Sequence, residues 1–155
     1  MKVSKIAGLT ALALFLLLVV VALVVRVRGF RASSEPTLFE ASVARAVRNF
    51  AIPSAESHRK NPYLGDELTL QRGRDIFLTR CASCHGTDGR GTTPIGRNVY
   101  PRVPNLHESA TQRLSDGEIH YIIQNGVQLS GMPAMPGLRS ESDRDSWALV
   151  SYVRN

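Results

Sequence analysis

A mainly helical domain behind one N-terminal membrane-spanning helix is the fold that the sequence predicts. Twenty uncharged, mostly apolar residues run from Ile6 to Val25, which is long enough for a helix to cross a bilayer. Helix-start signals occur near both ends of residues 66–155. No stretch alternates apolar and polar residues as a half-buried strand does. We therefore expect an all-α chain, with three to five short helices in the folded domain.

Residues 1–27 are expected to form a transmembrane anchor that is not cleaved. At about 1.5 Å per residue the apolar run spans about 30 Å, which is close to the hydrocarbon thickness of a bilayer. A cleaved signal peptide usually has a shorter apolar run that ends at a small-x-small site. Here Arg26, Arg28 and Arg31 follow the run, and it does not end at such a site. The basic residues on its two sides nearly balance, so charge alone leaves the orientation open.

The excess positive charge is confined to the first part of the chain. Residues 1–61 hold nine Lys or Arg against three Asp or Glu, whereas residues 62–155 hold ten of each kind. The basic excess therefore lies beside the apolar segment, where it can meet anionic lipid headgroups. The net charge of +6 consequently gives no reason to expect nucleic acid as a partner.

Residues 28–65 are expected to be a basic, amphipathic linker that Pro36, Pro53 and Pro62 punctuate. Between the first two prolines, apolar residues recur at helical spacing, at Phe39, Val43, Val47 and Phe50. This spacing predicts a short helix. The sequence leaves open whether that helix lies on the membrane surface or packs against the folded domain.

Residues 66–155 are expected to form the folded domain. Its helices are expected over residues 67–80 behind Asp66, from the capping box Ser115–Glu118 to Gly126, and behind Ser142 to the C-terminus. Residues 86–110 are rich in Gly, Pro, Thr and Asn and are expected to be loops. A domain this small, with such long loops, needs a bound group to complete its core.

The two cysteines of the chain stand three residues apart and precede a histidine, at Cys81, Cys84 and His85. At this spacing near a helix end both thiols project to one side, where they can bond to one haem while the histidine ligates its iron. A zinc site or an iron–sulfur cluster would need further ligands, and His107 and His120 are badly placed for that. A thioredoxin-like pair would need a strand–helix setting, and a plain disulfide is a further alternative. The motif therefore predicts one covalently attached haem c.

A Gly- and Pro-rich loop near the C-terminus supplies two methionines, Met132 and Met135, each followed by a proline. A methionine is ordinarily core filler, but both of these belong to a loop and not to a helix face. A thioether from this loop can complete the iron coordination, and His/Met ligation raises the reduction potential because soft sulfur stabilises ferrous iron. Iron with two protein ligands transfers electrons without binding a substrate.

Five separate motifs occur in order between Leu68 and Val153. They are Gly73-x-x-x-Phe77, the segment from Cys81 to His85, Pro104-Asn105-Leu106, the loop from Asn125-Gly126 to Gly131-Met132-Pro133-Ala134, and Leu149-x-x-Tyr152. Together they make this stretch similar to the class I cytochromes c. The resemblance implies short helices around one covalent haem, with the first and last helices crossing at Gly73.

The resemblance also implies roles for individual residues. The family's Gly-Met-Pro-Ala pattern aligns its sixth iron ligand with Met132, and Met135, also followed by proline, is the alternative. The carbonyl of Pro104 would orient His85, and Leu106 would pack on the haem. Arg97, Asn98 and Tyr100 either bind the haem propionates or belong to a solvated loop, and His58, His107 and His120 are expected to be ordinary surface residues.

These features predict a membrane-anchored electron carrier that is not itself an enzyme. It would pass electrons between donor and acceptor proteins, either alone or as the cytochrome subunit of a respiratory or dehydrogenase complex. A haem sensor or peroxidase-like protein with a labile sixth ligand is the alternative. Because covalent haem is added outside the cytoplasm in bacteria, the resemblance implies a single-pass protein of the inner membrane with its haem domain on the periplasmic face.

Overall fold

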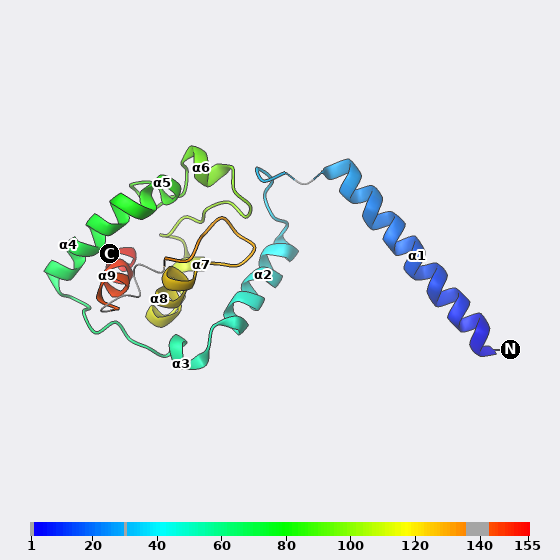
Figure 1. Cartoon of the computed structure of the whole chain (residues 1–155), viewed down its shortest axis with the longest axis horizontal. Coiled ribbons are helices and arrows are strands. Elements are labelled where there is room, and N and C mark those ends of the chain that lie inside the picture. Colours follow the sequence, from blue (N-terminus) through cyan, green and yellow to red (C-terminus); the bar gives the residue numbers. More distant parts are fainter. Residues whose placement is uncertain (1, 30, 136–142) are drawn as a thin grey trace. The chain divides into compact units, whose positions relative to one another are not determined.

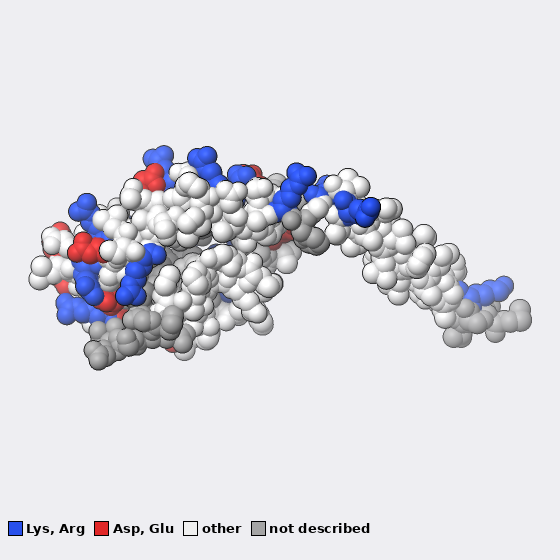
Figure 2. All heavy atoms as spheres, turned by 45° about the horizontal axis from the view of Figure 1, so that its top comes forward, with Lys and Arg blue, Asp and Glu red and all other residues white. Residues whose placement is uncertain are grey.

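The computed structural model describes residues 2–29, 31–135 and 143–155, and it divides into two compact units (Figure 1). The first unit, Met1–Arg31, contains the helix α1 (Lys2–Arg28). The most apolar 18-residue window of the segment Lys5–Arg28 has a mean hydropathy of 3.0, and none of that window is buried against protein. Figure 2 shows the shaft of α1 without charged side chains. By length and composition α1 can cross a membrane, as predicted.

The second unit, Ala32–Asn155, consists of helices joined by loops, and its described residues contain no strand. Its elements are α2 (Leu38–Ala51), α3 (Ser54–Ser57), α4 (Glu67–Ile76), the π-helical turn η1 (Phe77–Cys81), α5 (Ala82–His85), α6 (Pro94–Arg97), α7 (Ser109–Gln112), α8 (Asp116–Asn125) and α9 (Arg144–Arg154). The prediction of an all-α chain is therefore confirmed for the part of the chain that the structure describes.

The predicted capping residues begin and end helices as expected. The Asp66 side chain accepts a hydrogen bond from the backbone N–H of Leu68 at the start of α4. Ser115 and Glu118 form a complete capping box at the start of α8, and Gly126, with φ of 69°, ends that helix. The expected cap of α9, Ser142, lies outside the described residues.

Helices α4 and α9 cross at Gly73, and this crossing organises the core. A Cβ atom at Gly73 would collide with the carbonyl of Ala148, so only glycine allows the two backbones to approach this closely. Ile76 and Phe77 on one side and Leu149 on the other form an apolar cluster, which we call the crossing cluster. The resemblance implied that the first and last helices cross at Gly73, against Leu149 and Tyr152. The atoms closest to Gly73 are backbone atoms of Ala148 and Leu149.

Part of the expected linker contributes to the packing of the second unit. Ile52 and Asn61 are buried, and the Asn61 amide donates hydrogen bonds to the Trp147 carbonyl and the Ser151 hydroxyl. The Ser115 hydroxyl in turn donates to the carbonyl of Ser57. The chain between α2 and α4 is therefore fastened to α8 and α9.

Candidate haem site

Cys81, Cys84 and His85 are carried by the end of one long helical stretch that runs from α4 through η1 into α5. At the π-helical turn the backbone N–H of Ala82 donates to the carbonyl of Phe77, five residues back, instead of four. The stretch ends at Gly86, whose φ of 78° is a conformation that glycine adopts without strain. Both thiols and the imidazole thus lie within the last turns of one rigid element.

The His85 ring is half-buried beside Phe77, with 6.2 Å between the ring centroids. Its Nδ1 atom is buried and has no hydrogen-bond partner among the residues that the structure describes. Burial lowers the pKa of His85 because a charged imidazolium would lose its hydration. The ring is therefore neutral at neutral pH, which is the form of histidine that ligates metals.

The two cysteines are partly buried and carry free thiols, so the plain disulfide is not formed. Burial raises the pKa of the Cys81 thiol to about 11. Cys81 packs against the crossing cluster, with Leu106 from the long loop beside it. The arrangement places two free thiols at the edge of an apolar surface.

The loop after α5 folds back and holds the carbonyl end of the motif. The Thr93 hydroxyl donates to the Cys84 carbonyl at 2.9 Å, and the backbone N–H of Gly91 donates to the His85 carbonyl at 2.7 Å. Gly96 lies so close to the Cys84 carbonyl that a Cβ atom there would collide with it. Sequence reasoning did not find these residues, although the Thr-Pro pair at the start of α6 is a recognisable helix-start signal.

Pro104 and Leu106, the two residues expected beside the haem, differ in their burial and in what they contact. Leu106 is half-buried and packs on the crossing cluster, and its contact with a haem stays a prediction. Pro104 is exposed, and its carbonyl lies near Gly91. The hydrogen bond that we expected between this carbonyl and His85 is not formed, since Nδ1 of His85 has no partner among the described residues.

The loop after α8 forms a short strap that carries both methionines. The Met132 carbonyl accepts from Val127 at 3.1 Å and its N–H donates to the Ser130 hydroxyl at 3.1 Å. Farther along, the N–H of Met135 donates to the Gln124 carbonyl at 3.2 Å. Within the described residues Met135, not Met132, packs on the crossing cluster that also contacts Cys81, whereas Met132 is half-buried outside that cluster.

Of the other residues singled out from the sequence, Arg97, Asn98 and Tyr100 are exposed, and the Asn98 amide donates to the Pro94 carbonyl. Arg97 ends the short helix α6, Asn98 caps it, and all three side chains face solvent in this structure. His58 and His107 are exposed, as expected. His120 is fully buried, so its expected place on the surface was wrong. Its ring stacks on Trp147 at 4.0 Å, a contact that the local sequence around His120 does not reveal.

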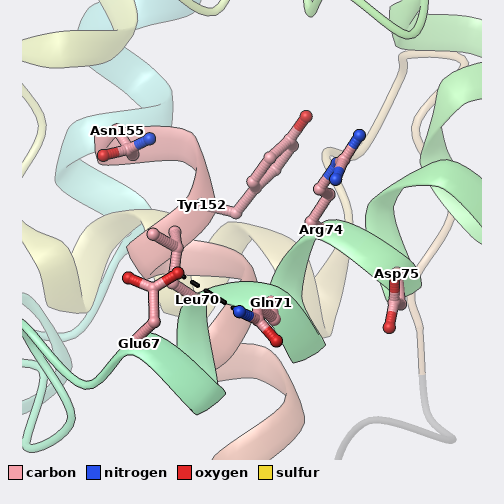
Figure 3. Close-up of a pocket in the computed structure, with 7 residues that line it drawn as sticks. All are labelled: Glu67, Leu70, Gln71, Arg74, Asp75, Tyr152 and Asn155. Atoms are coloured by element: carbon pink, nitrogen blue, oxygen red, sulfur yellow. Dashed lines mark hydrogen bonds between the residues drawn. The ribbon is translucent and has the colours of Figure 1, made fainter.

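The cavities on the second unit do not coincide with the motif. A cavity of about 330 Å³ lies between α4 and the end of α9, lined by Glu67, Arg74, Asp75 and Tyr152 among others (Figure 3). A smaller one of about 170 Å³ opens beside Phe77 and Leu106. The larger is lined mainly by polar side chains and includes none of the predicted haem residues.

The residues present fit a haem. Two thiols at the right spacing, a neutral imidazole with an unpartnered nitrogen, and an apolar cluster that includes Leu106 lie together at the end of one helix. Haem supplies the large apolar face and the metal that these groups suit.

The chain was compared with known proteins. Residues 68–153, more than half of the chain, match the family model described as cytochrome c oxidase, cbb3-type, subunit III. Among curated proteins none matches the chain.

Two solved structures are similar at low identity. One is a chain of the reducing HAO-like protein complex of Kuenenia stuttgartiensis (TM-score 0.47, 25% identity), where 56% of this chain is covered and 43% of that chain. The other is cytochrome cL of the marine methylotrophic bacterium Methylophaga aminisulfidivorans (TM-score 0.47, 20% identity), with 67% and 68% covered. This chain thus spans less than half the length of the Kuenenia chain.

Proposed function

Since the chain belongs to the family of cytochrome c oxidase, cbb3-type, subunit III, and is a class I cytochrome c behind an N-terminal apolar helix, we propose that it is a membrane-anchored carrier of single electrons with one covalent haem. Membership of the family makes it a haem-binding, electron-carrying c-type cytochrome. The number of haems, their attachment, the anchor and the protein partners belong to the proposal.

The observation that carries the proposal is the free His85 imidazole between a pair of unpaired thiols and an apolar cluster. Cys81 and Cys84 would hold the haem through its vinyl groups, and His85 would be the proximal ligand. When bound, the haem supplies iron that cycles between the ferric and ferrous states. The chain's own residues hold the imidazole neutral, exclude water with Phe77 and Leu106, and fix the geometry through one rigid helical stretch.

Met132 is our proposed sixth ligand, and Met135 is its rival. Met132 has both backbone polar groups fixed by Val127 and Ser130, while its side chain is outside the crossing cluster. Met135 already has a structural role on that cluster. Because backbone hydrogen bonds hold the loop at Met132 and the crossing cluster does not use its side chain, we expect the Met132 thioether to reach the iron.

We propose that α1 stays attached and anchors the protein in the bacterial inner membrane, with the haem domain on the periplasmic face. The support is its length, its hydropathy and the requirement that a c-type haem be attached outside the cytoplasm. An anchored carrier searches for its donor and acceptor in the membrane plane, which raises their effective concentration. The identity of its donor and acceptor proteins decides whether it acts alone or as the subunit of an oxidoreductase complex.

The attachment is tested on the full chain, expressed with haem-maturation machinery and purified in detergent. Wild-type protein should keep one haem per chain through a denaturing gel and give a c-type haemochrome spectrum. The double variant Cys81→Ser/Cys84→Ser should lose both properties. The matched control Ser83→Ala, which changes the exposed residue between the cysteines, should keep them. A haem that survives in the double variant contradicts the proposal.

The sixth ligand is tested on the ferric protein through the charge-transfer band of methionine-ligated iron. Met132→Leu should abolish the band and Met135→Leu should retain it. The opposite result would make Met135 the ligand. Carbon monoxide tests the carrier itself, because rapid stoichiometric binding to the reduced protein at neutral pH would indicate the labile sixth position of a sensor or peroxidase.

A further inference from the structure

Helix α2 (Leu38–Ala51) presents an unpartnered apolar face. Phe39 is 77% exposed, Phe50 is 92% exposed, and Val43 and Val47 between them are also exposed. These four side chains share one side of the helix because they are spaced at its turns. The capping box of Thr37 and Glu40 fixes the start of α2, so the face belongs to a well-formed helix.

The opposite side of α2 faces its own domain. Nine residues are two and a half helical turns, so Arg48 lies opposite Phe39, and Ala41 lies opposite Phe50. Ala41 and Arg48 are the two half-buried residues of this helix. Burial lowers the pKa of Arg48, and the charge of Glu118 on α8 acts in the other direction, so Arg48 lies toward α8. The apolar face is consequently turned away from the domain.

Both flanks of α2 are tied to that domain. Before the helix, the Arg102 guanidinium donates to the Glu35 carboxylate at 2.6 Å and to the Ser33 carbonyl at 2.9 Å. After it, Ile52 is buried and Arg59 pairs with Asp143. These contacts fix the direction of the apolar face relative to the haem domain. A helix on a loose linker would have no such fixed direction.

The chain near α2 indicates what covers this face. Only residues 29–37 separate α2 from the end of α1, a connection of about 30 Å at most when fully extended. Residues 26–51 hold five arginines against two glutamates, a balance that suits an anionic lipid surface. Phenylalanine and valine on one face, with a basic and polar face behind, are the composition of helices that lie in the membrane interface.

We propose that α2 lies on the surface of the bilayer, with Phe39, Val43, Val47 and Phe50 in the boundary between headgroups and acyl chains. This proposal rests on the proposed membrane anchor. Its consequence is that the haem domain is held close to the membrane in one orientation, because α2 is fastened to that domain at both flanks.

The test uses the full-length holoprotein in nanodiscs of phosphatidylcholine and phosphatidylglycerol, with a nitroxide label on a single introduced cysteine. Phe50→Cys places the label on the apolar face, and Ser42→Cys is the matched control about a quarter-turn away from it on the same exposed helix. The thioether-bonded haem leaves no other thiol to label. Both substitutions are at exposed positions, and an unchanged haem spectrum shows that each variant is folded.

Oxygen should reach the label at residue 50 more readily than a water-soluble nickel complex does, which places that label below the lipid phosphates. The label at residue 42 should show the reverse preference. Equal, water-like access at both positions in protein that remains in the nanodisc overturns the proposal. A label at residue 50 that neither reagent reaches also overturns it, since a protein surface then covers the face. Protein that does not enter nanodiscs at all would instead contradict the anchor, and labelling of more than one thiol would contradict the covalent haem.

Discussion

His85 is half-buried and His120 is fully buried, and each has an Nδ1 atom that is buried without a hydrogen-bond partner in the described part of the chain. Burial is also the main reason that the pKa of each is lowered. They differ at the other ring nitrogen. Nε2 of His120 lies 3.0 Å from the Ser146 hydroxyl and 3.3 Å from the Gln124 amide nitrogen, and its ring stacks on Trp147. Among the described residues, neither ring nitrogen of His85 has a hydrogen-bond partner, and its only aromatic ring contact is with Phe77, at 6.2 Å between the centroids.

The difference shows that burial alone does not identify a metal ligand. His120 has its Nε2 atom in a polar network that joins α8 to α9, so it serves the fold. Nε2 of His85 has no hydrogen-bond partner among the described residues, and two cysteines precede His85 on the same helical stretch, so it suits an external metal. The distinguishing feature is therefore Nε2, since Nδ1 is unpartnered in both rings.

The sharpest test of this contrast replaces each histidine in turn and follows the iron. His85→Ala should lower the yield of low-spin haem protein at least about tenfold, since even indirect partners of a metal ligand change affinity by that much. His120→Phe, which keeps a ring beside Trp147, should leave the absorption spectrum unchanged. Haem content and the visible spectrum measure both. A spectrum altered by the His120 variant but not by the His85 variant would reverse the assignment.

For the stability of the fold, His120 should matter more than His85. His120→Ala empties a fully buried site and removes the contacts with Ser146 and Gln124, so the free energy of unfolding should fall by about 2–4 kcal/mol. Denaturant unfolding of the holoprotein, followed by circular dichroism, measures the loss. The control is His58→Ala at an exposed position, expected to change stability by about 0.5 kcal/mol or less. Equal effects of the two substitutions would mean that the buried network contributes little.

Acid should weaken the fold through His120. Its pKa is lowered by burial and by Arg59, while Asp143 and Glu56 act in the raising direction. The unfolded chain therefore binds a proton that the folded chain does not, once the pH falls below the unfolded value of about 6.5. Stability should decline below that pH by up to about 1.4 kcal/mol per unit until the lowered folded pKa is reached. His120→Phe should lack this part of the decline, and identical pH profiles for the two proteins would exclude it.

The smallest effect should come from Arg59→Met. The pair of Arg59 with Asp143 is more than a third exposed, so its loss should cost at most about 1 kcal/mol. Removing a cation that lowers the pKa of His120 should move that pKa upward. The acid-dependent decline would then span a narrower range of pH. Titration of the His120 ring by nuclear magnetic resonance in the ferrous protein measures the change, and a downward shift would contradict it.

Local signals in the sequence predicted much of this fold. Asp66, Ser115 with Glu118, and Gly126 act on neighbouring residues, and each starts or ends a helix as expected. Gly73 was placed at the helix crossing through the resemblance alone, and the structure has it there.

Two of the missed features depend on contacts across long stretches of chain. His120 is buried because Trp147 and Ser146 arrive from α9, which the pattern around residue 120 does not show. Asn61 is buried through partners about ninety residues away. The haem residues themselves were found as a motif. The Thr-Pro pair at Thr93 marks a helix start, but it does not indicate that the Thr93 hydroxyl holds the Cys84 carbonyl.

The crossing of α4 and α9 also bears on when this protein can fold. Gly73 meets Ala148, which lies 75 residues later in the chain, so the core closes only after α9 has been synthesised. Contacts this distant in sequence form late, because the intervening loop must lose its freedom first. Until then Cys81 and Cys84 belong to an open chain, accessible to any enzyme that modifies them. The order of synthesis therefore gives the cysteines a period of full exposure before folding partly buries them.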